Sequence, residues 1–150
     1  MLFRSVCATV RQLGLGRIAG VYFDFGQSYI SSRTTISQQF LQDMVEALFP
    51  NPIVKINGNP NIEVVLRQRG DELLINLINL NGPHDNETVC VYDDIPAVLD
   101  ISMAINVGDE PSSVILAPEN IEMDFSYENG VIKLVVPEVK IHQIIVVKRR

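Results

Sequence analysis

Residues 121–136 constrain the fold most, because they combine a strand pattern with a tight-turn signal. In residues 121–128 apolar and polar side chains alternate, which is typical of a strand with one face in the core and one in solvent. Asn129 and Gly130 follow, and both residue types tolerate the positive φ angles of a type I′ turn. Residues 131–136 then return as an apolar run. The sequence therefore predicts a β-hairpin, which needs a second sheet to cover its apolar face.

Further strand patterns lie on both sides of this hairpin. They fall at residues 62–69, 72–80, 98–107, 113–116 and 140–147. Gly70 and Asp71 join the first two as a second hairpin. Seven or eight short strands separated by turns predict a mainly β protein with a C-terminal antiparallel β-sandwich. A Gly/Asn/Pro cluster at residues 57–60 predicts a boundary, with one domain at 1–57 and the sandwich at 58–150.

The first 57 residues predict a β-hairpin followed by one α-helix. Residues 7–12 and 17–25 read as two strands, and the second is so apolar that we expect it to need cover on both faces. After a Ser-rich loop, Thr35 and Gln38 form a capping box that opens the helix. Its apolar stripe consists of Ile36, Phe40, Leu41, Met44, Val45 and Leu48, and Pro50 and Pro52 end it. Two strands and one helix are too few for a self-sufficient α/β domain, which predicts missing neighbours.

Composition and charge exclude several classes of protein. With 47% apolar residues the 150-residue chain can bury one core. It has no run of about 18 apolar residues, so we expect no membrane span. The net charge is -6, and residues 70–132 hold thirteen acidic residues without a Lys or Arg, which disfavours nucleic acid as a partner. No secretory signal is visible, which makes the cytoplasm the default location. Cys7 and Cys90 match no metal or redox spacing, so we expect buried, unpaired thiols.

Acidic residues between two predicted strands are the candidate metal ligands. Asp85, Glu87, Asp93 and Asp94 lie near His84 and offer the oxygen donors that calcium prefers. No EF-hand spacing is present, and the alternative, a solvated acidic loop, is favoured. His142 falls on the wet face of its strand. The sequence contains no phosphate loop, zinc spacing or Ser-His-Asp order, so no cofactor and no catalytic residue is predicted.

Exposed aromatic side chains are the candidate carbohydrate-binding residues, because sugar rings stack on aromatic planes. The chain has no Trp and four Tyr. Tyr127 shares the dry face of Phe125 and is expected in the core. Tyr29 and Tyr92 are expected in loops and are therefore the better candidates, with packing in the core or loop as the alternative for each.

Several phrases of the sequence resemble one family. They are GLGRIAGVYFDFG at 14–26, IEVVLR at 62–67, ELLINLIN at 72–79 and VVPEVKIHQIIV at 135–146. They resemble the C-terminal part of glycoside hydrolases of the β-galactosidase and α-L-fucosidase-like type. There a TIM-barrel catalytic domain is followed by a glutamine-amidotransferase-like (trimerisation) domain and a small β-sandwich. The resemblance implies that residues 1–57 are the end of the amidotransferase-like domain and that the catalytic barrel lies upstream.

The expected function follows from the length of the chain, because 150 residues cannot contain a catalytic barrel. Glycoside hydrolysis uses two carboxylates across the scissile bond, and in a barrel enzyme they belong to a domain of about 250 residues. We therefore expect a non-catalytic accessory region that braces an upstream barrel or lies at a subunit interface. Two alternatives remain, a carbohydrate-binding β-sandwich module and a protein-interaction (oligomerisation) module.

Overall fold

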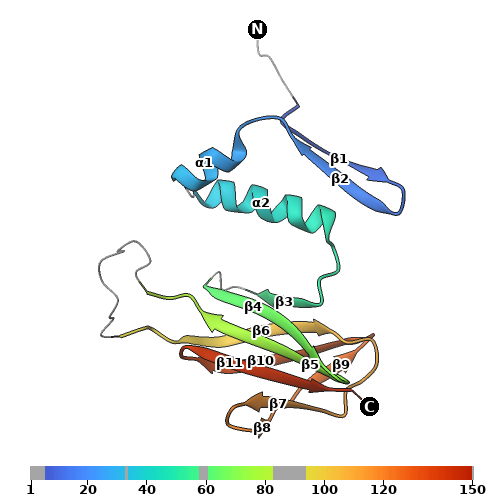
Figure 1. Cartoon of the computed structure of the whole chain (residues 1–150), viewed down its shortest axis with the longest axis vertical. Helices are drawn as coiled ribbons and strands as arrows, with labels where there is room; N and C mark the ends of the chain where they lie inside the picture. Colours follow the sequence, from blue (N-terminus) through green and yellow to red (C-terminus); the bar gives the residue numbers. More distant parts are fainter. Residues whose placement is uncertain (1–5, 33, 58–60, 83–93, 150) are drawn as a thin grey trace. The chain divides into compact units, whose positions relative to one another are not determined.

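The computed structural model describes residues 6–32, 34–57, 61–82 and 94–149 (Figure 1). The chain divides into two compact units, Met1–Pro52 and Ile53–Arg150. Strands dominate, as the sequence predicts. The first strand of the second unit, β3 (Val54–Asn57), pairs with a strand of the sandwich, although the turn cluster at 57–60 suggested a boundary after it.

The N-terminal unit contains a two-stranded antiparallel sheet and two helices. The strands are β1 (Ala8–Leu13) and β2 (Gly16–Val21), and the helices are α1 (Phe25–Ser32) and α2 (Thr35–Leu48). The prediction that a strand reaches residue 25 and a Ser-rich loop follows is wrong, because β2 ends at Val21 and the serines belong to α1. Asp24 accepts a hydrogen bond from the Gln27 amide, and the serine hydroxyls bond back to carbonyls one turn earlier. Their polar groups are therefore satisfied within a helix.

The N-cap of helix α2 lies one residue before Thr35, the residue with which the predicted capping box starts. Thr34 is the N-cap, and its hydroxyl accepts a hydrogen bond from the Ser37 amide at 3.2 Å. Thr35 is the first helical residue. At the other end the Phe49 amide bonds to the Val45 carbonyl at 2.7 Å, and the chain then passes through Pro50 and Pro52. The predicted helix is confirmed.

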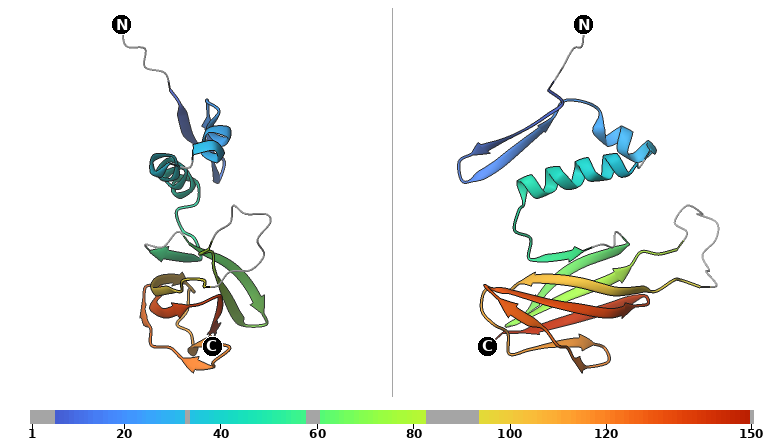
Figure 2. Two further views of the ribbon diagram at one scale, coloured as in Figure 1. Left: turned by 90° about the vertical axis from the view of Figure 1, so that its left-hand side faces the viewer. Right: turned by 180° about the vertical axis from the view of Figure 1, so that it is seen from behind.

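The C-terminal unit is a sandwich of two antiparallel sheets (Figures 1 and 2). The four-stranded sheet has the order β3, β6 (Val98–Asn106), β10 (Val131–Val139) and β9 (Ser126–Glu128). The five-stranded sheet has the order β4 (Ile62–Arg69), β5 (Glu72–Asn79), β11 (His142–Lys148), β7 (Ser113–Ala117) and β8 (Ile121–Glu122). The predicted β-sandwich is therefore confirmed.

The hairpin at Asn129 and Gly130 forms as predicted, but its first strand is divided between the sheets. Asn129 and Gly130 have φ angles of 51° and 82°, and Glu128 pairs with Val131 across the turn. The expected single strand at 121–128 consists of β8 in one sheet and β9 in the other. The half-buried Met123 and Phe125 between them pack against the core. A strand that crosses between sheets keeps its apolar alternation, so the sequence pattern alone does not reveal the break.

Tyr127 does not lie in the core. Its side chain is 37% exposed, and its hydroxyl donates a 2.7 Å hydrogen bond to the Gly108 carbonyl. Tyr127 pairs with the buried Ile132, so it lies on the inward face that strand parity predicts, but β9 is the edge strand of the four-stranded sheet and leaves the side chain partly exposed. The prediction that Tyr127 lies in the core is therefore wrong.

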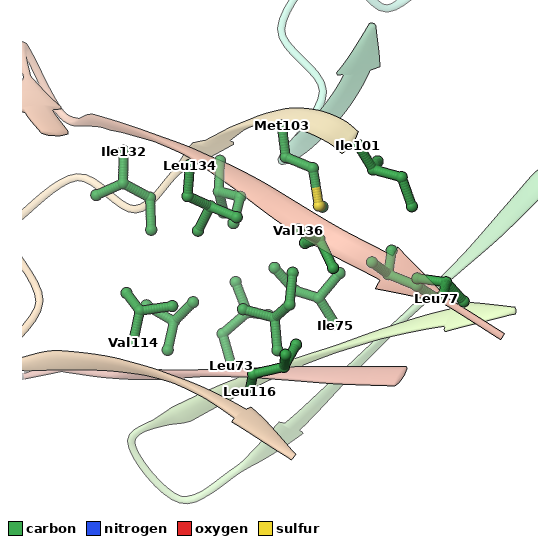
Figure 3. Close-up of a cluster of buried hydrophobic side chains, with 14 of the residues drawn as sticks. Leu73, Ile75, Leu77, Ile101, Met103, Val114, Leu116, Ile132, Leu134 and Val136 are labelled. Carbon is green, nitrogen blue, oxygen red and sulfur yellow. The ribbon is translucent and has the colours of Figure 1, made fainter. Parts of the chain in front are cut away.

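Aliphatic side chains from the two facing sheets interdigitate to form the core (Figure 3). Alternate residues of each strand point inward, as Leu73, Ile75 and Leu77 of β5 do. Across the core lie Ile101, Met103, Leu134 and Val136 of the four-stranded sheet. All residues of this core belong to the C-terminal unit.

Candidate functional site

The N-terminal unit has no buried residue among those that the structure describes. It nevertheless carries most of the large apolar side chains that the chain exposes. They are Val6, Val10, Leu13, Leu15, Ile18, Val21, Tyr22, Phe23, Ile30, Ile36, Leu41, Val45, Leu48 and Phe49. Scattered exposed apolar residues are ordinary, but a unit without a core of its own is typical of a surface that another protein covers.

One face of the two-stranded sheet lies on α2. The Arg17 guanidinium donates a 2.8 Å hydrogen bond to the Ala47 carbonyl near the end of the helix. The Phe23 ring packs on Phe40 of α2 with a centroid distance of 5.8 Å. Tyr22, one residue earlier, is 63% exposed, and its hydroxyl meets that of Thr9 at 2.7 Å. Because neighbouring strand residues point to opposite faces, Tyr22 and Ile18 mark the face that α2 leaves open.

Helix α2 is also apolar on a side that the unit does not bury. Phe40 and Met44 are half-buried, as the predicted stripe requires. Leu41, Val45 and Leu48 follow one another at helical spacing, and all three are exposed, Val45 by 51%. We call Ile18, Tyr22, Leu41, Val45 and Leu48 the uncovered N-terminal residues. They lie on the open side of the sheet and on the helix that backs it, so the unit resembles a layer taken from a thicker α/β structure.

Tyr29, one of the two predicted sugar-binding aromatic residues, lies in α1 and not in a loop. It is half-buried, and its ring packs on Phe25 with a centroid distance of 5.7 Å. Phe25 in turn contacts Phe40 at 5.0 Å. The ring therefore belongs to an aromatic cluster that joins the two helices, and part of its surface is already covered by Phe25.

The candidates around residue 90 fall mostly outside the described part of the chain. Tyr92, Asp85, Glu87 and Asp93 lie there, as do His84 and Cys90. The described Cys7 is unpaired, as predicted, but it is exposed and not buried. Asp94 is described and exposed, and it lines a shallow cleft of about 470 Å³ with Pro96 and Ile141. Among the residues that the structure describes, no group of three potential ligands is arranged to hold a metal ion. The predicted calcium site stays a prediction.

A second cleft, of about 370 Å³, lies at one end of the sandwich. It is formed by the turn between β7 and β8 and the turn between β10 and β11. Its lining residues are Leu116, Pro118, Glu119, Ile121, Pro137, Glu138, Lys140, Ile141, His142 and Gln143. The Glu138 carboxylate and the Lys140 ammonium lie 3.7 Å apart at its rim.

The Gln143 side chain fixes the position of the Glu119 carboxylate in this cleft. Its side chain is only 7% exposed, and its amide donates a hydrogen bond to the Glu119 carboxylate. A buried amide that holds a carboxylate in place offers fixed acceptors to a ligand hydroxyl or amine. Sequence reasoning missed this pair. A signal existed for Gln143, because it shares the inward strand parity of Ile145 and Val147 and is therefore expected to be buried. His142 points to the other side, is exposed as predicted, and meets the Asn76 side chain at 3.1 Å.

The chain resembles solved structures but no family model and no curated protein. No protein-family model matches the sequence, and no curated protein matches it significantly. Among solved structures the chain is similar to alpha-L-fucosidase isoenzyme 2 from Paenibacillus thiaminolyticus, with a TM-score of 0.77 and 16% identity. The match covers 94% of this chain and 22% of that one. The chain therefore has the fold of a segment of a glycoside hydrolase and spans about a fifth of that protein's length. None of the described helices is long and apolar enough to cross a membrane.

Proposed function

We propose that this chain is a non-catalytic accessory region of a glycoside-hydrolase-like protein. It packs through its N-terminal unit on the catalytic barrel or on a neighbouring subunit. The observation that carries the proposal is that this unit buries no described residue while Ile18, Tyr22, Leu41, Val45 and Leu48 remain uncovered. The shared fold with a fucosidase segment supports the kind of parent protein.

The apolar surface of the N-terminal unit is large enough to drive docking. Complete burial of a large apolar side chain contributes about 1.5–3 kcal/mol relative to full exposure. The five uncovered residues are roughly half exposed, so covering them contributes about 5 kcal/mol, which is comparable with the net stability of a small domain. A partner that covers this unit therefore stabilises its fold and binds it at the same time.

The finer assignment is part of the same proposal. Residues 1–57 are the last strands and helices of an amidotransferase-like, trimerisation-type domain, and residues 58–150 are the C-terminal sandwich of a β-galactosidase- or fucosidase-like parent. The two-stranded sheet, with α2 on one face and no described cover on the other, supports this assignment. In the parent, further strands would extend that sheet.

The non-catalytic part is tested with nitrophenyl glycosides, including the α-L-fucoside and the β-galactoside. Glu119 and Glu138 are the carboxylates that line the cleft with the fixed amide, so they are the residues to substitute. We expect the 150-residue chain and its Glu119→Gln and Glu138→Gln variants to release nitrophenol at the buffer rate. Hydrolysis above that rate that either substitution abolishes would contradict the proposal.

The docking part is tested with a dye that fluoresces on apolar surfaces. Leu41→Glu combined with Val45→Glu keeps strong helix formers in α2 but removes two uncovered apolar side chains. We expect this variant to lose a measurable part of the dye fluorescence of the native chain, whereas Gln42→Glu, on the same helix, leaves it unchanged. Equal fluorescence in all three proteins would mean that the helix is covered in solution.

Carbohydrate binding is the second candidate, because the 370 Å³ cleft combines apolar walls with a carboxylate held by a buried amide. Tyr29 and Tyr92 stay candidate stacking residues under this proposal. Glycan-array screening tests it, with binding that Glu119→Ala, Tyr29→Ala or Tyr92→Ala removes as the supporting result. A calcium role for Asp85, Glu87, Asp93 and Asp94 likewise remains a proposal, and titration calorimetry with calcium chloride tests it directly.

A further inference from the structure

The outer face of the five-stranded sheet is apolar, although it is not the face that meets the other sheet. On β5 and β11 the inward residues are mostly aliphatic, and half of the outward residues are aliphatic as well. The inward residues belong to the core, and the outward ones are Leu74 and Ile78 on β5 and Ile144 and Val146 on β11. Val65 of β4 and Ile115 of β7 extend this set on either side. We call the set Val65, Leu74, Ile78, Ile115, Ile144 and Val146 the outer apolar face.

The register places these side chains next to one another. Leu74 pairs with Val146, and Val146 pairs with Ile115, so three aliphatic residues form one row across three strands. Ile144 lies two residues from Val146 on the same face and is paired with Asn76. No described element of the sandwich lies over this face (Figures 1 and 2), but Val146 is only 8% exposed and the other five side chains are half-buried. A sheet with two apolar faces requires cover on both.

The four-stranded sheet supplies an internal comparison. Its outward positions include Lys55, Asn57, Ser102 and Lys133, which are exposed and polar or charged. Two exposed aliphatic residues, Leu99 at 61% and Val135 at 52%, lie among them. The outer face of the four-stranded sheet is therefore mixed, whereas the outer apolar face groups its aliphatic residues in adjacent rows.

The one polar side chain in the middle of the outer apolar face already has its partners. The Asn76 amide donates a 3.1 Å hydrogen bond to the Val65 carbonyl, and its oxygen lies 3.1 Å from a His142 ring nitrogen. One amide N–H and the amide oxygen of Asn76 are therefore already paired, which lowers the cost of covering this side chain.

The charges on β4 are arranged to suit a second copy of the same face. Glu63, Val65 and Arg67 point outward from this strand, so an acid and a base lie on either side of an aliphatic residue. In a two-fold dimer with the strands of the two copies reversed, Glu63 of each copy meets Arg67 of the other. The chain has a net charge of -6, which disfavours association with itself unless acidic and basic residues face one another. The outward Glu63 and Arg67 allow such pairing between two copies.

We propose that the outer apolar face is the interface of a symmetric dimer of this chain, formed between two five-stranded sheets. This interface is separate from the N-terminal docking surface and does not depend on the proposed function. Four strands about 4.8 Å apart and seven paired residues of about 3.4 Å each give a footprint of about 450 Å². That is below the roughly 800 Å² per partner of a standard complex, so we expect weak association with a micromolar dissociation constant.

Sedimentation velocity over about a hundred-fold range of concentration tests the dimer. The native chain should pass from monomer to dimer. Leu74→Lys and Ile144→Lys should each weaken the dimer at least about tenfold, because each places a charge in an apolar contact. Val135→Lys, on the outer face of the other sheet, is the matched control and should leave the dissociation constant unchanged. Circular dichroism of each variant serves to check that it remains folded.

A charge exchange tests the two-fold arrangement without touching the apolar residues. Glu63→Lys and Arg67→Glu should each weaken the dimer several-fold, and the double variant should restore it. A chain that stays monomeric at every concentration overturns the proposal. Association that Leu74→Lys leaves intact but Leu41→Glu with Val45→Glu removes also overturns it, and would instead place self-association on the N-terminal unit.

Discussion

Removing the side chain of Asn79 should loosen one end of the sandwich. Its amide donates to the Lys140 carbonyl at 2.7 Å, to the Pro96 carbonyl at 2.9 Å and to the Val139 carbonyl at 3.3 Å. Its oxygen accepts a 2.8 Å hydrogen bond from the Asn81 amide. One side chain thus ties the end of β5 to the turn between β10 and β11 and to the segment that enters β6.

The cost of Asn79→Ala follows from this bonding. Two amide protons and one accepted bond amount to about three hydrogen bonds, each contributing about 1 kcal/mol net. Several of these atoms are reached by water, which reduces the expected loss in the free energy of unfolding to about 2 kcal/mol. For a unit of this size unfolding in urea has a slope of about 1 kcal/mol per molar, so the midpoint should fall by about 2 M.

Urea unfolding followed by far-ultraviolet circular dichroism measures this shift. Asn106→Ala, at an exposed asparagine of β6, is the matched control, and its midpoint should change by less than about 0.5 M. If Asn79→Ala shifts the midpoint no more than the control, the assigned role of this side chain is wrong.

Three further substitutions test other parts of the fold. Ile75→Ala opens a cavity beneath a fully buried side chain and should reduce the free energy of unfolding by about 2–5 kcal/mol, whereas Val135→Ala, on the solvent face, should change it by less than about 0.5 kcal/mol in the same titration. Gly130→Ala should reduce it by about 1–2 kcal/mol, because the residue has a φ of 82° and an added Cβ would lie 3.1 Å from the Gly108 carbonyl oxygen; a neutral result in a thermal melt would contradict the type I′ geometry. Thr34→Ala removes the N-cap of α2 and should cost that helix about 1 kcal/mol, seen as faster amide exchange in its first turn, whereas Thr35→Ala should not.

Much of the sandwich was predictable because its signals are local. Asn129 with Gly130 and Gly70 with Asp71 fix the two turns by their φ preferences, and alternation fixes which residues of β5 face inward. Elements that depend on tertiary contacts were not predictable. Helix α1 forms where serines signalled a loop, because Asp24 and the serine hydroxyls satisfy a short helix that packs its aromatic side on Phe40.

The candidate site was predicted less well than the fold. Strand parity identified the inward face of Tyr127, but its strand lies at the edge of a sheet, and periodicity does not show which strands are edge strands. The pairing of Gln143 with Glu119 joins residues that are far apart in sequence, so only the fold brings them together. Tyr29 was identified by type alone, and its packing on Phe25 depends on a helix that the sequence did not indicate.

The central claim is that the sandwich is stable by itself, whereas the N-terminal unit needs a partner that covers its apolar side chains. Hydrogen exchange of the 150-residue chain tests this claim most directly. The paired amides of β5, β10 and β11 should exchange only on global unfolding of the sandwich. The paired amides of β1 and β2 should exchange at least about a hundred-fold faster, a difference of about 3 kcal/mol in opening free energy. Equal protection of β1, β2 and the sandwich strands would contradict the account, because it would show that the N-terminal unit is already covered and stable without a partner.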